Sequence, residues 1–186
     1  MLVVGLGNPG SDYEFTRHNV GFLAVDSLAS HFGASWQKNV KLSTNIATTI
    51  HYGKKLIFIK PITYMNESGR AASAVKNYYK IDLDNIVVIH DELDLPCGEV
   101  RYKLSGGSAG HNGIKSIDQA IGNAYHRIRI GIDKPLHKDM VSDFVLSNFI
   151  NSEKPQINHA ITAITNGFKF FINDDIEKFI SSLRGA

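Results

Sequence analysis

The sequence is poor in cysteine and has no long apolar run, and both shortages exclude classes of protein. Its 186 residues contain one cysteine, Cys97, so no disulfide can form within the chain. Such usage is typical of a reducing compartment. Cys97 stands in the turn-like segment 95–98, with no helix start to lower the pKa of its thiol. A nucleophilic cysteine is therefore not expected.

No apolar stretch approaches the roughly 18 residues that indicate a transmembrane helix. The chain opens on Leu2, Val3 and Val4, which suit a strand, without the basic segment that begins a signal peptide. We therefore expect a soluble, cytoplasmic protein without a membrane partner. The length favours a single domain over residues 1–186, large enough to fold without a disulfide or metal.

The formal net charge of +2 says little about partners, but its distribution is uneven. Between residues 99 and 138 there are seven basic and three acidic residues, an excess of four positive charges. The basic residues are Arg101, Lys103, Lys115, Arg127, Arg129, Lys134 and Lys138. Charge alone leaves open whether this excess binds a phosphate-bearing partner or forms an ordinary solvated face.

Strand-like and helix-like segments alternate along the chain, which predicts an α/β domain. The strand-like segments are residues 2–6, 46–52, 55–60, 86–90, 99–104 and 127–132. Helical periodicity covers residues 20–32, 68–79, 113–121 and 153–171, and Asp174 and Asp175 cap a last helix that ends at Leu183. Gly53 and Lys54 suit a hairpin turn, so the sheet is expected to be mixed.

Polar segments follow three of the predicted strands, at residues 7–18, 61–69 and 91–98. In open α/β sheets, ligands bind outside the carboxyl ends of the strands. The polar side chains of these segments are therefore expected to converge on one pocket.

Three motifs suggest other chemistries, and each lacks its context. Residues 5–10 match the dinucleotide pattern G-x-G-x-x-G, but Pro9 removes an amide and the helix begins only near His18. Residues 106–110 match the G-x-S-x-G nucleophile elbow around Ser108, but the strand before them alternates charged and apolar residues. The acidic run 90–94 lacks the helical spacing of metal ligands, so no metal or cofactor is expected.

A second set of residues is chemically consistent. One histidine, one aspartate and three asparagines follow strand ends or begin helices: His18, Asp91, Asn8, Asn66 and Asn112. A neutral imidazole can take a proton from water near neutral pH, and an aspartate on its far nitrogen holds the tautomer. Asparagine amides can donate to an oxyanion. This composition favours activation of water over covalent catalysis.

Motifs spread in order from residue 3 to about 149 resemble those of bacterial peptidyl-tRNA hydrolases. They are GLGNPG at 5–10 with Tyr13, TRHNVG at 16–21, KPITYMNESG at 60–69, HDELDLP at 90–96 with Gly98, GGSAGHNG at 106–113, RIRIGI at 127–132 and VSDFVL at 141–146. The resemblance implies a twisted mixed sheet flanked by helices, in a monomer with no obligate protein partner.

The resemblance also implies a reaction, hydrolysis of the ester between an N-blocked peptide and the 3′ end of tRNA. His18 would be the base that activates water and Asp91 its orienting partner, while Asn8, Asn66 and Asn112 would position substrate and water.

The same resemblance implies the residues that bind tRNA. Tyr13, Tyr64 and Met65 would contact the substrate, with Tyr13 near the acceptor end, and Lys103 with Arg129 would clamp the 5′-phosphate. An RNA-binding module without catalysis, or a serine esterase that uses Ser108, remains an alternative.

Overall fold

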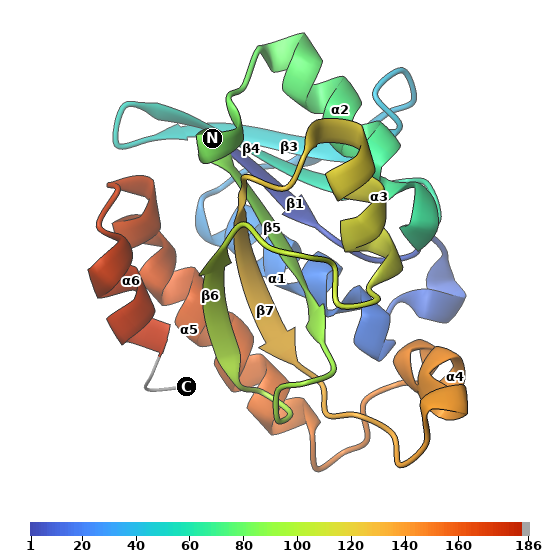
Figure 1. Cartoon of the computed structure of the whole chain (residues 1–186). Coiled ribbons are helices and arrows are strands. Elements are labelled where there is room, and N and C mark those ends of the chain that lie inside the picture. The colour runs from blue at the N-terminus through green and yellow to red at the C-terminus, as the bar shows by residue number, and fades with distance from the viewer. Residues whose placement is uncertain (184–186) are drawn as a thin grey trace.

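The computed structural model describes residues 1–183, and one seven-stranded sheet with the strand order β2-β3-β4-β1-β5-β7-β6 forms its centre (Figure 1). The strands are β1 (Leu2–Gly5), β2 (Trp36–Asn39), β3 (Thr44–His51), β4 (Lys54–Pro61), β5 (Ile86–Glu92), β6 (Val100–Leu104) and β7 (His126–Gly131). The predicted end of the domain at residue 186 lies outside the described residues.

The sheet is mixed, as predicted. Strands β4, β1, β5 and β7 run parallel, whereas β2, β3 and β6 pair antiparallel with their neighbours. The hairpin between β3 and β4 is present, but its turn residues are Tyr52 and Gly53 rather than Gly53 and Lys54. Both have positive φ, 53° and 71°, the backbone shape of the tight turns that suit twisted hairpins.

Helices cover both faces of the sheet. They are α1 (Val20–His31), α2 (Ser68–Tyr79), α3 (Asn112–Ile121), α4 (Val141–Leu146), α5 (Lys154–Ile172) and α6 (Ile176–Leu183). Figure 1 shows α2 and α3 in front of the sheet and α1 and α5 behind it. Each face buries its own apolar cluster, which explains why β1 and β5 consist largely of Val, Ile and Leu. None of the helices within residues 1–183 is both long enough and apolar enough to span a bilayer.

Two elements escaped prediction from sequence. Strand β2 contains Gln37, Lys38 and Asn39 and lies at an edge of the sheet, so it has no apolar run to mark it. Helix α4 has six residues, too few for helical periodicity to be recognised.

Close packing of glycines brings the start of α1 against the ends of β1 and β5. A Cβ atom at Gly21 would collide with the carbonyl oxygen of Ile89, and one at Gly5 would lie 2.5 Å from the carbonyl oxygen of Gly21. The main chain of Leu6 donates to Ile89 O (3.0 Å) and accepts from Phe22 N (3.1 Å). The turn before α1 is thereby held beside the carboxyl end of β5.

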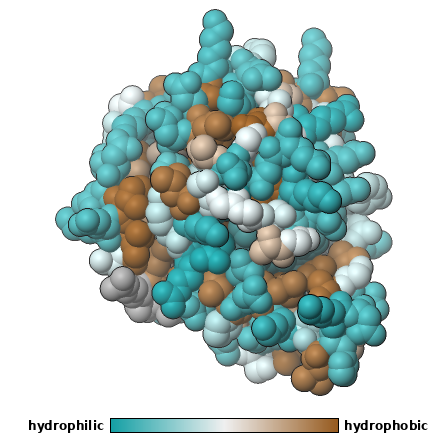
Figure 2. Space-filling view, in the orientation of Figure 1, coloured by the Kyte–Doolittle hydropathy of each residue, from teal (hydrophilic) through white to brown (hydrophobic). Residues whose placement is uncertain are grey.

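The surface seen in Figure 2 is mainly hydrophilic, with apolar residues gathered in a few areas. One of these areas is at lower right, where Figure 1 places α4. Leu146 at the end of α4, and Leu136 and Met140 shortly before it, are exposed apolar residues.

Candidate active site

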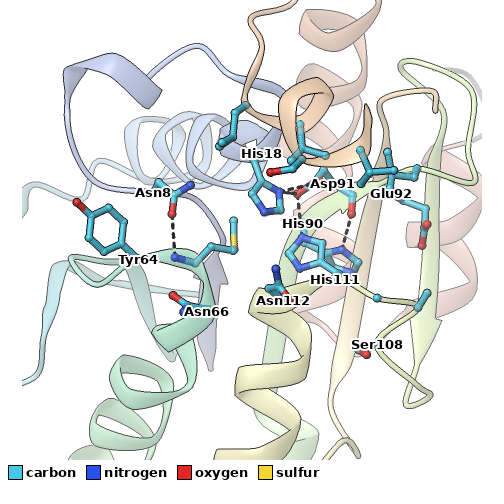
Figure 3. Close-up of a pocket in the computed structure, with 18 of the residues that line it drawn as sticks. Asn8, His18, Tyr64, Asn66, His90, Asp91, Glu92, Ser108, His111 and Asn112 are labelled. Atoms are coloured by element: carbon cyan, nitrogen blue, oxygen red, sulfur yellow. Dashed lines mark hydrogen bonds and ion pairs between the residues drawn. The ribbon is translucent and has the colours of Figure 1, made fainter. Parts of the chain in front are cut away.

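A cleft of about 590 Å³ lies where the segments after β1, β4 and β5 meet the glycine-rich loop before α3 and one side of α4 (Figure 3). The polar residues that line it include Asn8, His18, Tyr64, Asn66, His90, Asp91, Glu92, Ser108, His111 and Asn112. The predicted convergence of the three polar segments is therefore confirmed.

His18 and Asp91 meet at the base of this cleft. His18 lies on a 3-10 turn, Arg17–Asn19, immediately before α1, and Asp91 is the penultimate residue of β5. Nδ1 of His18 lies 2.9 and 3.0 Å from the two carboxylate oxygens of Asp91. Because an ionised carboxylate only accepts hydrogen bonds, Nδ1 carries the proton and Nε2 is left for the cleft.

His111, to which the sequence analysis assigned no role, shares the same carboxylate. Its Nε2 lies 2.9 Å from Oδ1 of Asp91, while its Nδ1 accepts hydrogen bonds from the main-chain amides of Gly113 (3.1 Å) and Ile114 (3.3 Å). His111 thus caps the N-terminus of α3, and it donates from Nε2 to Asp91. Asn112 is the first residue of this helix and is exposed.

Burial and the two imidazoles shift the pKa values at this site. Burial alone would raise the pKa of Asp91, but His18 and His111 outweigh it and hold that pKa well below its usual range. Burial alone would lower the pKa of His18, and the charge and hydrogen bonds of Asp91 raise it above its usual value. Neighbouring His90 is fully enclosed, and burial lowers its pKa to about 3, so it stays neutral at cell pH.

Asn8 is held in place by hydrogen bonds to two other segments. Its side-chain Oδ1 accepts from the main-chain amide of Met65 (2.8 Å), and its main-chain amide donates to Oδ1 of Asn19 (2.8 Å). Nδ2 of Asn19 donates to Asn8 O (2.9 Å), a positioning contact that sequence reasoning missed although Asn19 belongs to the TRHNVG motif. With Oδ1 occupied, the side-chain nitrogen Nδ2 of Asn8 remains available to a ligand in the cleft.

The other predicted contact residues lie at different depths. Met65 is buried and Tyr64 is 59% exposed at the rim, and both line the cleft. Asn66 is exposed on the short 3-10 turn Met65–Glu67. Tyr13 is not among the lining residues, and its main-chain amide donates to Gly10 O at 3.2 Å within the preceding turn. Its role toward tRNA stays a prediction.

The basic residues of the sheet divide into two kinds. Lys103 is exposed on β6, and Arg129 on β7 lies 3.4 Å from Glu92, a residue of the cleft. Arg127, counted with them as part of a basic surface, is instead 2% exposed. Its guanidinium donates to Gly106 O (2.7 Å), Gly107 O (2.8 Å) and Asp118 (2.9 Å) and so anchors the glycine-rich loop.

One group of possible metal ligands coincides with the site. Donor atoms of His18, Asp91 and His111 lie within 4.8 Å of one another. Nδ1 of His18 and Nε2 of His111 each lie 2.9 to 3.0 Å from oxygens of Asp91, which are hydrogen-bond distances. The arrangement suits proton transfer, and the absence of a metal remains a prediction.

Fold and cleft together define an α/β enzyme whose candidate base is a histidine held by a buried aspartate. Comparison with known proteins specifies the class further. The family model described as Peptidyl-tRNA hydrolase matches residues 2–186. The chain belongs to the peptidyl-tRNA hydrolase family.

Individual relatives agree with this assignment. The chain is 48% identical over 183 residues to a peptidyl-tRNA hydrolase of Rickettsia bellii, covering 98% of this chain and 99% of the relative. It is 47% identical over 179 residues to one from Rickettsia felis, covering 96% and 97%. The crystal structure of peptidyl-tRNA hydrolase from Acinetobacter baumannii superposes with a TM-score of 0.95 at 36% identity, over 98% of this chain and 93% of that one. The predicted family, fold and enzyme class are confirmed.

Proposed function

We propose that this chain hydrolyses the ester bond between an N-blocked peptide and the 3′ end of tRNA, using a water molecule activated by His18. The observation that carries the proposal is the buried contact between His18 Nδ1 and Asp91, which leaves Nε2 open to a polar cleft. Membership of the family supports the substrate class.

The reaction needs neither a metal nor a covalent intermediate. Nε2 of His18 removes a proton from water as the oxygen attacks the ester carbonyl, and Asp91 stabilises the imidazolium that forms. The tetrahedral oxyanion then collapses, the ester bond to the 3′-oxygen breaks, and His18 returns the proton to that oxygen. The products are a free peptide acid and a tRNA with a free hydroxyl.

The asparagines supply hydrogen-bond donors around the ester. The fixed side chain of Asn8 and the exposed amides of Asn66 and Asn112 border the cleft from three different segments. One amide donor to an oxyanion contributes about 10²–10³ in rate. We assign these amides to the carbonyl, the water and the terminal adenosine. The exposed apolar residues near α4 suit the peptide side chains.

Recognition of tRNA involves residues beyond the cleft. Lys103 and Arg129 lie on the adjacent strands β6 and β7, and Arg129 contacts Glu92 of the cleft. They carry the positive charge needed to hold the 5′-phosphate of the acceptor stem. The 3′-CCA end would then enter the cleft past Tyr13 and Tyr64. In the cytoplasm, such an enzyme, working as a monomer, recycles tRNA from peptidyl-tRNA that has dissociated prematurely from translation.

Purified protein should cleave a peptidyl-tRNA and spare free aminoacyl-tRNA. His18→Ala should lower turnover by about 10² or more while tRNA still binds, because only the base is lost. His31→Ala, at an exposed histidine near the end of α1, is the matched control. Near-normal turnover in His18→Ala would refute the assignment.

Two further measurements test a serine esterase and a metal-dependent reaction as alternatives. Ser108→Ala should retain activity, and its loss would point to a serine esterase. A chelator should have no effect, and activity that disappears with chelator and returns with added metal would contradict the metal-free reaction.

A further inference from the structure

Arg17, the residue before the candidate base, is 5% exposed and tied to distant parts of the chain. Its Nη2 donates to both carboxylate oxygens of Glu153 at 2.8 and 2.7 Å. Its Nη1 donates to Oγ of Ser147 at 2.8 Å and to the carbonyl oxygens of Ser147 and Asn148. One guanidinium therefore joins the turn that carries His18 to the segment between α4 and α5.

Further contacts fix the same junction. The Arg17 guanidinium lies 4.5 Å from the ring centroid of Phe144 and 5.3 Å from that of Phe149, within cation–π range. The main-chain amide of Arg17 donates to Ser147 O at 3.0 Å, and Glu153 also accepts from the amide of Ile150 at 2.8 Å. Main chain, ring faces and ion pair thus hold one geometry.

The segment reached by Arg17 forms part of the cleft. Val141, Ser142, Val145 and Leu146 of α4 line the cavity into which His18 faces, and α4 lies beside the turn that precedes α1 (Figure 1). Arg17 itself is not among the lining residues. A displacement of its guanidinium would therefore move both the base and one wall of the cleft.

We propose that Arg17 is a positioning residue, which sets His18 against Asp91 and fixes the α4 wall through its shared contacts with Ser147 and Glu153. The inference rests on the proposed function. A buried ion pair often contributes no more stability than apolar side chains of similar volume, so geometry explains this one better than stability. Arginine is required because a lysine offers a single point charge, whereas the guanidinium donates to Glu153 from one nitrogen and to residues 147 and 148 from the other.

The test compares Arg17→Lys, Glu153→Gln and Ser147→Ala with the control Asp174→Asn. The control removes the charge of Asp174, whose side chain is largely exposed in its pair with Lys54. Arg17→Lys and Glu153→Gln should lower kcat by about 10- to 100-fold, because small displacements of reacting groups are costly. Ser147→Ala should lower kcat less, and Asp174→Asn should leave it unchanged.

A second readout follows the His18 ring directly by NMR titration of its imidazole. Ser147→Ala changes no charge, so a shift of the His18 midpoint reports altered contact with Asp91, the carboxylate that faces it from β5, or with His111 beside it. We expect the midpoint to fall in this variant and to stay unchanged in Asp174→Asn.

The outcomes separate the two proposals. Wild-type protein that leaves peptidyl-tRNA intact would contradict the proposed function, while the His18 titration would still test Arg17. If wild type is active and all three variants keep its kcat and His18 midpoint, Arg17 has no positioning role. An effect confined to KM would also overturn the inference, because the base would then be independent of Arg17. If Arg17→Lys and Glu153→Gln fail to fold, the kcat and the His18 midpoint of Ser147→Ala decide whether Arg17 has a positioning role.

Discussion

Asp91 organises two imidazoles with a single buried carboxylate. It accepts from Nδ1 of His18 and from Nε2 of His111, so each ring has a defined tautomer and orientation. Sequence motifs indicated His18 and Asp91, but no local pattern distinguished His111 from a structural histidine. Its position depends on where α3 begins relative to β5, which is a property of the packed molecule.

The pH dependence of kcat/KM should report this arrangement. A general base acts in its neutral form, so activity should rise with pH through the pKa of His18, which Asp91 raises above its usual value. In Asp91→Asn the raising charge is lost and burial remains, so the midpoint should fall by about 1–3 pH units. Rate profiles of wild type and Asp91→Asn measure this, with Asp94→Asn at an exposed acid as control. An unchanged midpoint in Asp91→Asn would contradict the role of the pair.

At the scale of elements, the glycine-rich loop before α3 takes its shape from a buried arginine. Arg127 on β7 donates to the carbonyl oxygens of Gly106 and Gly107 and to Asp118, and Tyr125 donates to Asp118 as well (2.7 Å). The loop leads directly to His111, so β7 indirectly determines how the cleft is completed.

Replacement of Arg127 by methionine should be costly. The change leaves the charge of Asp118 without its partner and releases two carbonyl groups of the loop, so the free energy of unfolding should fall by about 3–5 kcal/mol. Urea unfolding monitored by circular dichroism measures it. Arg101→Met on neighbouring β6, where Arg101 is exposed and pairs with half-buried Glu99, should change stability by less than about 1 kcal/mol. Equal losses in the two variants would show that buried Arg127 contributes no more to stability than exposed Arg101.

The whole molecule presents a nearly neutral chain with a local basic excess. Arg127 is buried, but the other cations of that group, including Lys103 and Arg129, are exposed or half-buried. A charge distribution of this kind attracts a polyanion without a high overall charge.

Binding of tRNA should therefore weaken with salt. For about two to three phosphate contacts, log Kd against log salt should change with a slope of magnitude about 1.5–3. Lys103→Ala and Arg129→Ala should each reduce that magnitude by about 1 and weaken binding uniformly across tRNA sequences. Titrations at several salt concentrations provide the measurement, and a flat response would exclude the phosphate clamp.

The amino-acid sequence by itself determined the order of most strands and helices, the mixed sheet, and the convergence of His18, Asp91 and Asn8 on one cleft. These features follow from local apolar patterns and from the rule that strand ends in a parallel sheet meet at one edge. Only the tertiary structure decided that His111 joins Asp91, that Arg127 is buried, and that Arg17 binds Glu153, 136 residues away. Such contacts join side chains whose distance depends on how whole elements pack, and no pattern among neighbouring residues encodes that distance.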